Sequence, residues 1–329
     1  MAETYSTLAA LFTDIADAIR EKTGATATIV ADDFPDVIRN VLQVKTYLTF
    51  SSPSSFTLKV NDTTKHWDGI LEYSTDTSTW STWDGATTLS SATSRSDNVL
   101  YLRGTGNTVI TGNGNKDSYK WVLTGSNITC IGNIENLLDY ATVESGNHPT
   151  MADYCYYYMF YGCTSLTQAP ALPATTLAEN CYAYMFRGCT SLTQTPVLPA
   201  TTLAVGCYQD MFYGCTSLTQ APALPATTLS TYCYSYMFRG CTSLTQIPAL
   251  PATTLVGYCY QYMFQDCSKI KLSSTQTGEY TIAYRIPTTG TGATAVSALN
   301  RTFASTGGTF TESPEINTTY YLSNTNTIV

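Results

Sequence analysis

The sequence predicts an α+β chain of several domains, in the order helical hairpin, small β-sandwich and solenoid. Three observations predict this order: apolar residues recur with a helical period near the N-terminus, with a period of two after Tyr47, and in a fixed block of 26 residues further on. We place the boundaries at 1–43 for the hairpin, 44–126 for the sandwich, 127–310 for the solenoid with its caps and 311–329 for a C-terminal tail.

The first 43 residues carry two helical patterns. One runs from residue 6 to Gly24, and the other starts at Asp32 or Asp33 with Pro35 in its first turn. Two short helices are marginally stable alone, so we expect this segment to dock onto a partner, onto another copy or onto the next domain. The residues expected to form this anchor are Leu8, Leu11, Phe12, Ile15, Ile19, Phe34, Val37, Ile38 and Val41.

Short alternating runs follow Tyr47 and are separated by Asp-Gly, Gly-Asn and Ser-Pro, which is typical of a small β-sandwich. Trp67, Trp80 and Trp83 lie close together in this stretch. They either belong to the core with one residue at its rim, or form an aromatic platform for a sugar. The second interpretation requires two of them to be exposed.

The repeated unit reads CYxxMFxGCTSLTQxPxLPATTL, and its two cysteine columns start at Cys155 and Cys163. One unit cannot bury its own apolar face, so neighbouring units must stack. We expect residues 128–140 to cap the stack at its start and residues 298–308 to close it. A fifth, degraded unit begins at Tyr258 and lacks the PxLPATTL half.

The chain has 11 cysteines. The two in each unit are eight residues apart, which is about 12 Å if the CYxxMFxGC stretch is helical, and this is too far for a disulfide. We therefore expect buried free thiols. Bridges between units and metal binding are the alternatives.

The MFxGCTSLT core resembles leucine-rich repeats of the BspA type, which are common in bacterial surface proteins. In that family an AFxGC turn precedes a short strand and its cysteine points inward, as we expect for Cys163 and its column. Cys155 and its column stand where the family usually has an aliphatic residue. The resemblance covers roughly residues 127–308 and implies a leucine-rich-repeat solenoid.

The stretch LFTDIADAIREKTGATATIVADDFPDVI is similar to the leading segment of tail and other virion proteins of phages. This resemblance implies that residues 1–43 attach the chain to other virion proteins.

Composition argues against several functions. A net charge of −8 with 12% charged residues disfavours a nucleic-acid partner. No apolar run approaches the length of a membrane span, and the start carries acidic residues without a basic segment, so we expect neither membrane insertion nor a secretory signal. His66 and His148 are far apart in sequence and no catalytic motif is present, so we expect no enzyme, no cofactor and no metal.

Positions that vary between near-identical units are candidates for ligand contact, because the scaffold leaves exposed positions unconstrained. Tyrosine and arginine dominate these positions, and both are favoured binding residues. The alternative is that the tyrosines only stack on one another as a ladder. The candidates are Tyr158, Tyr161, Tyr184, Arg187, Tyr213, Tyr236, Arg239 and Tyr262.

These observations together predict a phage virion protein, either a receptor-binding tail fibre or a decoration protein, that is made in the host cytoplasm. Its repeat surface is expected to bind a bacterial surface glycan or protein, and a homotrimer is possible. The alternatives are a bacterial adhesin at the cell surface or outside the cell, and a purely structural capsid or tail component.

Overall fold

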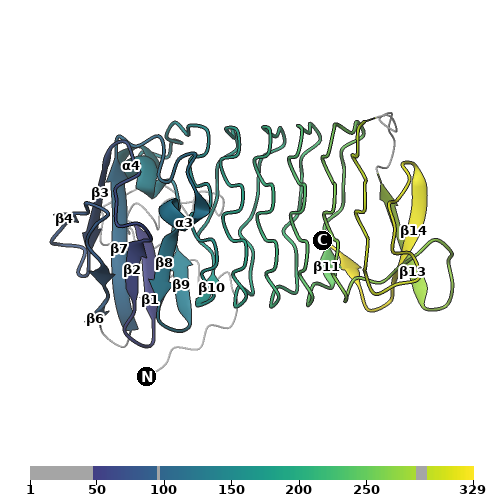
Figure 1. Cartoon of the computed structure of the whole chain (residues 1–329), viewed down its shortest axis with the longest axis horizontal. Coiled ribbons are helices and arrows are strands. Elements are labelled where there is room, and N and C mark those ends of the chain that lie inside the picture. The colour runs from purple at the N-terminus through teal and green to yellow at the C-terminus, as the bar shows by residue number, and fades with distance from the viewer. Residues whose placement is uncertain (1–46, 95–96, 287–294) are drawn as a thin grey trace, which may run out of the picture. The chain divides into compact units, whose positions relative to one another are not determined.

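The computed structural model describes residues 47–94, 97–286 and 295–329. The two predicted N-terminal helices and their anchor residues lie outside this part of the chain. Residues 47–329 form one compact unit in which the repeats follow one another along a long axis (Figure 1). Strands outnumber helices among the described residues, and the helices there are α3 (Lys116–Tyr119) and α4 (Asn136–Glu144).

Two sheets, almost entirely antiparallel, build the first part of this unit. The larger has the strand order β10-β9-β1-β7-β3-β4, with β6 paired to β7, and the smaller has the order β5-β2-β8. Phe50 of the first sheet and Leu58 of the second belong to the same buried core. The strands are β1 (Leu48–Ser52), β2 (Thr57–Val60), β3 (Ile70–Ser74), β4 (Ser81–Thr82), β5 (Leu89–Ser90), β6 (Ala92–Ser94), β7 (Asp97–Thr105), β8 (Trp121–Thr124), β9 (Ile128–Ile131) and β10 (Leu166–Gln168).

The tryptophans belong to this core. Trp67 and Trp83 are 3% and 1% exposed, and their ring centroids are 5.1 Å apart. Trp80 lies at the rim, where the Arg103 guanidinium covers its ring at 4.1 Å. The core interpretation is therefore confirmed, and the sugar platform is wrong because only one of the three residues reaches the surface.

Sheet hydrogen bonding continues from this part into the repeats. β9 pairs antiparallel with β1 and parallel with β10, which is the strand of the first repeat. The predicted N-terminal cap, residues 128–140, supplies β9 and the start of α4. The domain boundaries drawn from the sequence stay predictions.

The first half of each unit, for which we considered a helix, is instead a succession of turns. Every fourth residue has a left-handed backbone; in the first unit Tyr154, Tyr158 and Gly162 have φ of 58°, 60° and 72°. A residue in this conformation ends an α-helix. The buried residues Cys155 and Met159 follow the same spacing of four, which suits consecutive turns better than a helical period.

Hydrogen bonds in this half alternate between two kinds of partner. The amides of Tyr156 and Tyr158 donate to the carbonyls of Cys181 and Ala183 in the next unit, at 2.8 and 3.2 Å. The amide of Met159 instead donates to the Tyr156 carbonyl within its own turn, at 3.1 Å. Since the alternation recurs through the stack, backbone groups satisfy one another on this side without help from side chains.

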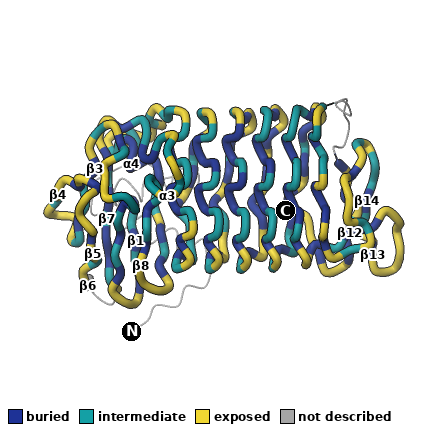
Figure 2. Tube along the Cα trace, viewed as in Figure 1, coloured by how far each residue is buried: buried dark blue, intermediate teal, exposed yellow. Residues whose placement is uncertain are grey.

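Side chains stacked in columns fill the interior, and buried segments recur in register from one repeat to the next (Figure 2). Consecutive phenylalanine rings from Phe160 to Phe264 lie 5.6 or 5.7 Å apart and are tilted by 10° or less. A parallel column of buried tyrosines runs from Tyr156 to Tyr260. The stacking expected from the sequence is thus present in the described repeats.

All eleven cysteines are buried free thiols. In the second column Cys163 donates to the Trp121 carbonyl at 3.3 Å, and the later thiols donate to a phenylalanine carbonyl of the preceding unit: Cys189 Sγ lies 3.1 Å from Phe160 O, and Cys215 Sγ lies 3.2 Å from Phe186 O. The same contact recurs in the next two units. Cysteine therefore supplies both a small apolar volume and a weak donor between units.

Flanking segments donate or accept backbone hydrogen bonds at both ends of the stack. At its start, the amides of Ile110 and Thr111 donate to the Cys155 carbonyl at 2.9 and 3.0 Å. At its end, the segment from Ala298 lies on the fifth unit, where the Tyr260 amide donates to the Ala298 carbonyl at 3.0 Å. Residues from Ala298 onward thus contact the last unit, and the closing role of residues 298–308 stays a prediction.

The C-terminal residues replace the missing half of the fifth unit. β15 (Thr327–Ile328) pairs in parallel with β11 (Gln246–Ile247), the last strand of the intact units. A three-stranded sheet with the order β12-β14-β13 lies beside it, formed by β12 (Leu272–Ser273), β13 (Tyr280–Ile286) and β14 (Thr318–Ser323).

Candidate ligand-binding face

The eight candidate residues lie together on the turn half of the units. We call the surface made by Tyr158, Tyr161, Tyr184, Arg187, Tyr213, Tyr236, Arg239 and Tyr262 the Tyr–Arg face. All eight side chains are half-buried. They occupy two neighbouring columns, one passing through Tyr158 and the other, three residues later in each unit, through Tyr161.

Tyrosine pairs occupy the two ends of the first column. The rings of Tyr158 and Tyr184 are 4.7 Å apart, and those of Tyr236 and Tyr262 are 4.6 Å apart. Asp210 holds the position between the pairs. The ladder that we considered as an alternative is therefore present, but it is interrupted in the third unit.

Backbone strain distinguishes these tyrosines from the interior columns. Tyr158, Tyr184, Tyr236 and Tyr262 have φ between 56° and 60°. A non-glycine residue in this region is destabilised by about 1–2 kcal/mol. Aspartate, which tolerates the left-handed region better, fills the same place in the third unit. Because a more tolerant residue fits the scaffold, the tyrosines are not required by the backbone.

The arginines of the second column lie against tyrosine rings. Arg187 and Arg239 flank Tyr213, with guanidinium carbons 4.0 and 5.4 Å from its ring centroid. Arg239 also lies 5.9 Å from the Tyr262 ring. These contacts are within range for cation–π attraction, which orders the side chains and leaves part of each guanidinium to solvent.

Each arginine also pairs with an aspartate of the following unit. Arg187 Nη1 lies 2.6 Å from Asp210 Oδ1, and Arg239 Nε lies 3.2 Å from Asp266 Oδ2. The Asp210 side chain is only 5% exposed, whereas Asp266 is 43% exposed. Burial raises the pKa of Asp210 to about 6, although Arg187 acts in the opposite direction.

Sequence reasoning missed these ion pairs. The partners are 23 and 27 residues apart, close to the repeat length of 26. This spacing was the one sign in the sequence that an arginine could reach an aspartate of the next unit. The variable positions were also expected to be exposed. That expectation is wrong for Ala183, Asp210 and Ser235, which are buried.

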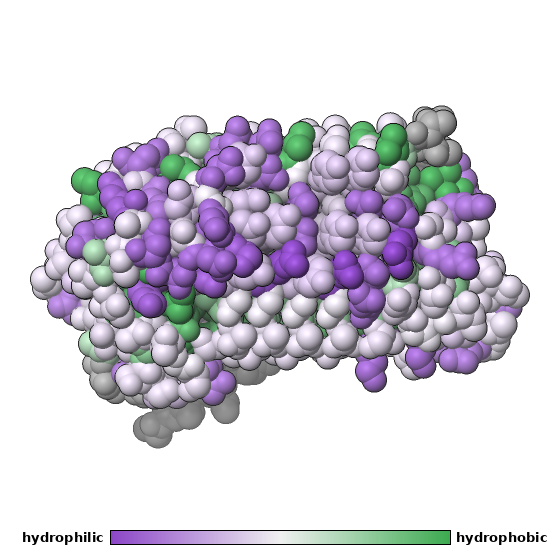
Figure 3. Space-filling view, viewed as in Figure 1, coloured by the Kyte–Doolittle hydropathy of each residue, from purple (hydrophilic) through white to green (hydrophobic). Residues whose placement is uncertain are grey.

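Positively charged side chains extend the Tyr–Arg face at both ends, and we call this line of cations and tyrosine rings the row. Lys116 and Lys120 lie 5.5 and 5.7 Å from the Tyr161 ring centroid, and Arg301 lies 5.7 Å from that of Tyr262. On the side seen in Figure 3, hydrophilic residues gather in a band along the repeats. The positive groups of the row are thus interleaved with aromatic rings.

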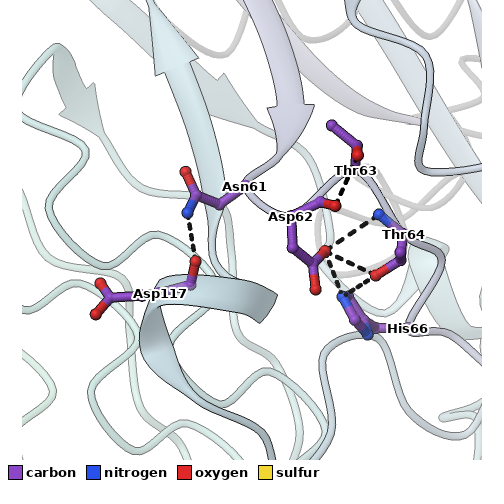
Figure 4. A network of polar contacts seen from close by, with 6 residues as sticks. All are labelled: Asn61, Asp62, Thr63, Thr64, His66 and Asp117. Carbon is purple, nitrogen blue, oxygen red and sulfur yellow. Dashed lines mark hydrogen bonds and ion pairs between the residues drawn. The ribbon is translucent and has the colours of Figure 1, made fainter.

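The loop after β2 carries a separate polar network (Figure 4). Asp62 Oδ1 lies 2.9 Å from His66 Nε2 and accepts hydrogen bonds from the Thr64 amide and hydroxyl at 3.1 and 2.7 Å. The His66 ring in turn lies 3.8 Å from that of Tyr119. The Thr64 hydroxyl also lies 3.0 Å from His66 Nε2. Because Asp62 and Thr64 meet the same ring nitrogen, the imidazole does not bridge the carboxylate and the hydroxyl as it would in a catalytic triad, and these contacts fix the loop.

An apolar groove of about 550 Å³ runs beside the Pro-x-Leu-Pro segments of the first two units. Val197, which is 77% exposed, and Ile131 contribute to its walls.

Within the described ranges no group of three or more His, Cys, Asp or Glu residues is placed to hold a metal ion. No helix in that same part of the chain is both long and apolar enough to cross a membrane.

A stack of short turns and strands defines a repeat protein of the solenoid class. The model of the BspA type leucine-rich repeat region matches six copies, over residues 120–219 and 179–285, which together make up half of the chain. The chain belongs to this family. Comparison with curated proteins and with solved structures found no significant match. Repeats of this kind support a role in protein interaction or adhesion.

Proposed function

We propose that this protein is a non-catalytic binding protein that presents the Tyr–Arg face to a component of a bacterial surface. The observation that carries the proposal is the set of half-buried tyrosines in a left-handed backbone conformation. Strained residues that the scaffold does not require are commonly retained for function. Tyrosine and arginine also provide large contact areas with little loss of side-chain entropy.

The finer assignment is a phage virion protein, in the tail or as a decoration of the particle. It rests on the similarity of the N-terminal segment to virion proteins. In this proposal residues 1–43 attach to other virion proteins and the repeats face outward, with a homotrimer as a possible assembly. A bacterial adhesin and a purely structural virion component are the alternatives.

Cell binding tests the proposal. The labelled full-length chain is expected to bind some strains of a panel of gut bacteria in a saturable way. The double variant Tyr184→Gly/Tyr236→Gly should lose most of this binding and remain folded, because glycine suits the left-handed backbone. A matched variant outside the face, Val197→Ala, should bind normally. Equal binding by all three chains would refute the role of the face.

Particle incorporation tests the virion assignment separately. Deleting residues 1–43 should leave the repeats folded and exclude the chain from particles. Incorporation of the deleted chain would refute the anchor, and recovery of the protein in a cell envelope without any phage would favour the adhesin.

A further inference from the structure

The Tyr–Arg face has a positive character that the whole chain lacks. The chain has a net charge of −8. Along this face, however, Lys116, Lys120, Arg187, Arg239 and Arg301 all lie within 6 Å of a tyrosine ring. Three carboxylates pair with four of these cations, Asp117 with both lysines, Asp210 with Arg187 and Asp266 with Arg239, so the five cations exceed the carboxylates by two. An anionic ligand would therefore be attracted to this row and repelled by much of the remaining surface.

The spacing of the arginines suits a polymer with repeated charges. Arg187 and Arg239 belong to units two apart, and each step between units is 5.7 Å along the phenylalanine column. Their separation along the stack is thus about 11 Å, comparable with the length of a disaccharide in an extended glycan. Tyrosine hydroxyls line the interval, and they can bond sugar hydroxyls.

Arg187, however, is held by Asp210. The Arg187 side chain is 30% exposed, and its guanidinium gives one hydrogen bond to the Asp210 carboxylate. The carboxylate is itself almost completely buried, so it cannot also be solvated by bulk water. Arg239 offers a comparison, because its partner Asp266 is 43% exposed and remains well solvated.

We infer that the Tyr–Arg face binds a linear glycan bearing carboxylate or other oxyanion groups, and that Arg187 becomes a contact for such a group when Asp210 is protonated. The step is a simple exchange. Asp210 takes up one proton from solvent and becomes neutral, and an Arg187 N–H group that pointed at the carboxylate donates to the ligand oxyanion instead. The inference rests on the proposed function, because it concerns the same face.

The surroundings of Asp210 place this exchange in a physiological range. The charged and titratable groups that act on or near it are Arg187, Arg239, Tyr184 and Tyr236, and Gln209 adds a hydrogen bond. Burial raises the pKa of Asp210 to about 6 against the effect of Arg187. The carboxyl group is thus mostly neutral at pH 5 and mostly ionised at pH 7.5.

Binding of the full-length chain to polygalacturonate, dextran sulfate and uncharged dextran, at pH 5 and pH 7.5, tests the inference. If the anion binds only when Asp210 is neutral, the affinity for the polyanions should fall roughly 30-fold between pH 5 and pH 7.5 from this group alone. The two polyanions distinguish carboxylate from sulfate recognition. Uncharged dextran should bind weakly at both pH values.

Asp210→Asn separates the effect of this carboxyl group from the general effect of pH on a chain whose isoelectric point is about 4.7. The variant should match the natural chain at pH 5 and bind roughly 30-fold tighter than it at pH 7.5. Asn tolerates the left-handed backbone of this position. Asp266→Asn, the matched control, should keep the pH dependence of the natural chain, and Arg187→Gln should bind weakly at both pH values.

Two results would overturn the inference. One is the same pH dependence in the natural chain and in Asp210→Asn, and the other is no binding of either polyanion at pH 5. Neither result bears on the proposed function if the chain still binds cells at pH 7.5. Loss of cell binding at every pH would instead remove the proposed function itself.

Discussion

Replacing Tyr236 by glycine tests whether the surface tyrosines hold the solenoid together. Tyr236 has φ of 59°, its ring stacks on Tyr262 at 4.6 Å, and its side chain is half-buried. Glycine loses the stacking, about 1 kcal/mol, and half of the burial of a large side chain, about 1 kcal/mol. It also loses about 0.7 kcal/mol in chain entropy. Relief of the left-handed strain returns about 1.5 kcal/mol.

The net loss expected for Tyr236→Gly is therefore about 1 kcal/mol. Tyr236→Ala keeps the strain and should be about 1 kcal/mol less stable than the glycine variant. Phe238→Ala, in the buried column between Phe212 and Phe264, should lose about 3–5 kcal/mol. Urea denaturation followed by circular dichroism measures all three. A loss above about 2.5 kcal/mol for Tyr236→Gly, or greater stability of the alanine variant, would refute the reasoning.

Three further predictions concern buried groups. Because its folded pKa is raised to about 6, Asp210 should stabilise the chain most below about pH 4 and lose this contribution, roughly 3 kcal/mol in all, as pH rises through 6. Urea denaturation should show about 2 kcal/mol of this loss between pH 4.5 and pH 7, and none of it in Asp210→Asn. All eleven thiols should resist alkylation at pH 8 in the folded chain and react in denaturant, because burial shields them and raises the pKa of groups such as Cys163 to about 12; mass spectrometry counts the adducts. Tyr284→Phe removes the buried hydrogen bond to the Pro248 carbonyl, 2.8 Å long, and should destabilise the chain by about 1–2 kcal/mol in the same urea assay, whereas no change would mean that the bond is not formed.

Much of the repeat could be predicted because its period is visible in the chain. The two cysteine columns predicted which residues stack, and the loss of PxLPATTL after Tyr258 marked the last unit. The conformation of the first half could not be derived so simply. Apolar residues spaced by four suit both a helix and consecutive turns over one short unit, and only a left-handed residue at every fourth place separates the two. Tyrosine at such a place is uncommon, so the residue type gave no signal of the turn.

The ion pairs of the Tyr–Arg face were harder to predict than its tyrosines. A column contains residues 26 positions apart, so repetition alone reveals neighbours within one column. Arg187 reaches Asp210 in the adjacent column of the next unit, and this diagonal contact depends on how the turn directs both side chains. The burial of Asp210 was equally hard to predict. Its short side chain occupies a position at which the other units have a large tyrosine ring.

The arrangement of the backbone also bears on why the units differ at the surface. In the turn half, alternate amides bond to the next unit and the others bond within their own turns. The interior columns of Phe, Met, Tyr and Cys repeat with little change, and they satisfy the packing requirement of every unit. Neither hydrogen bonding nor packing therefore requires tyrosine, arginine or aspartate on the Tyr–Arg face. Positions outside the face also vary, among them Val197 and the buried residues Ala183 and Ser235. The proposed ligand, which would extend across several units, accounts for the tyrosines and arginines of the face alone.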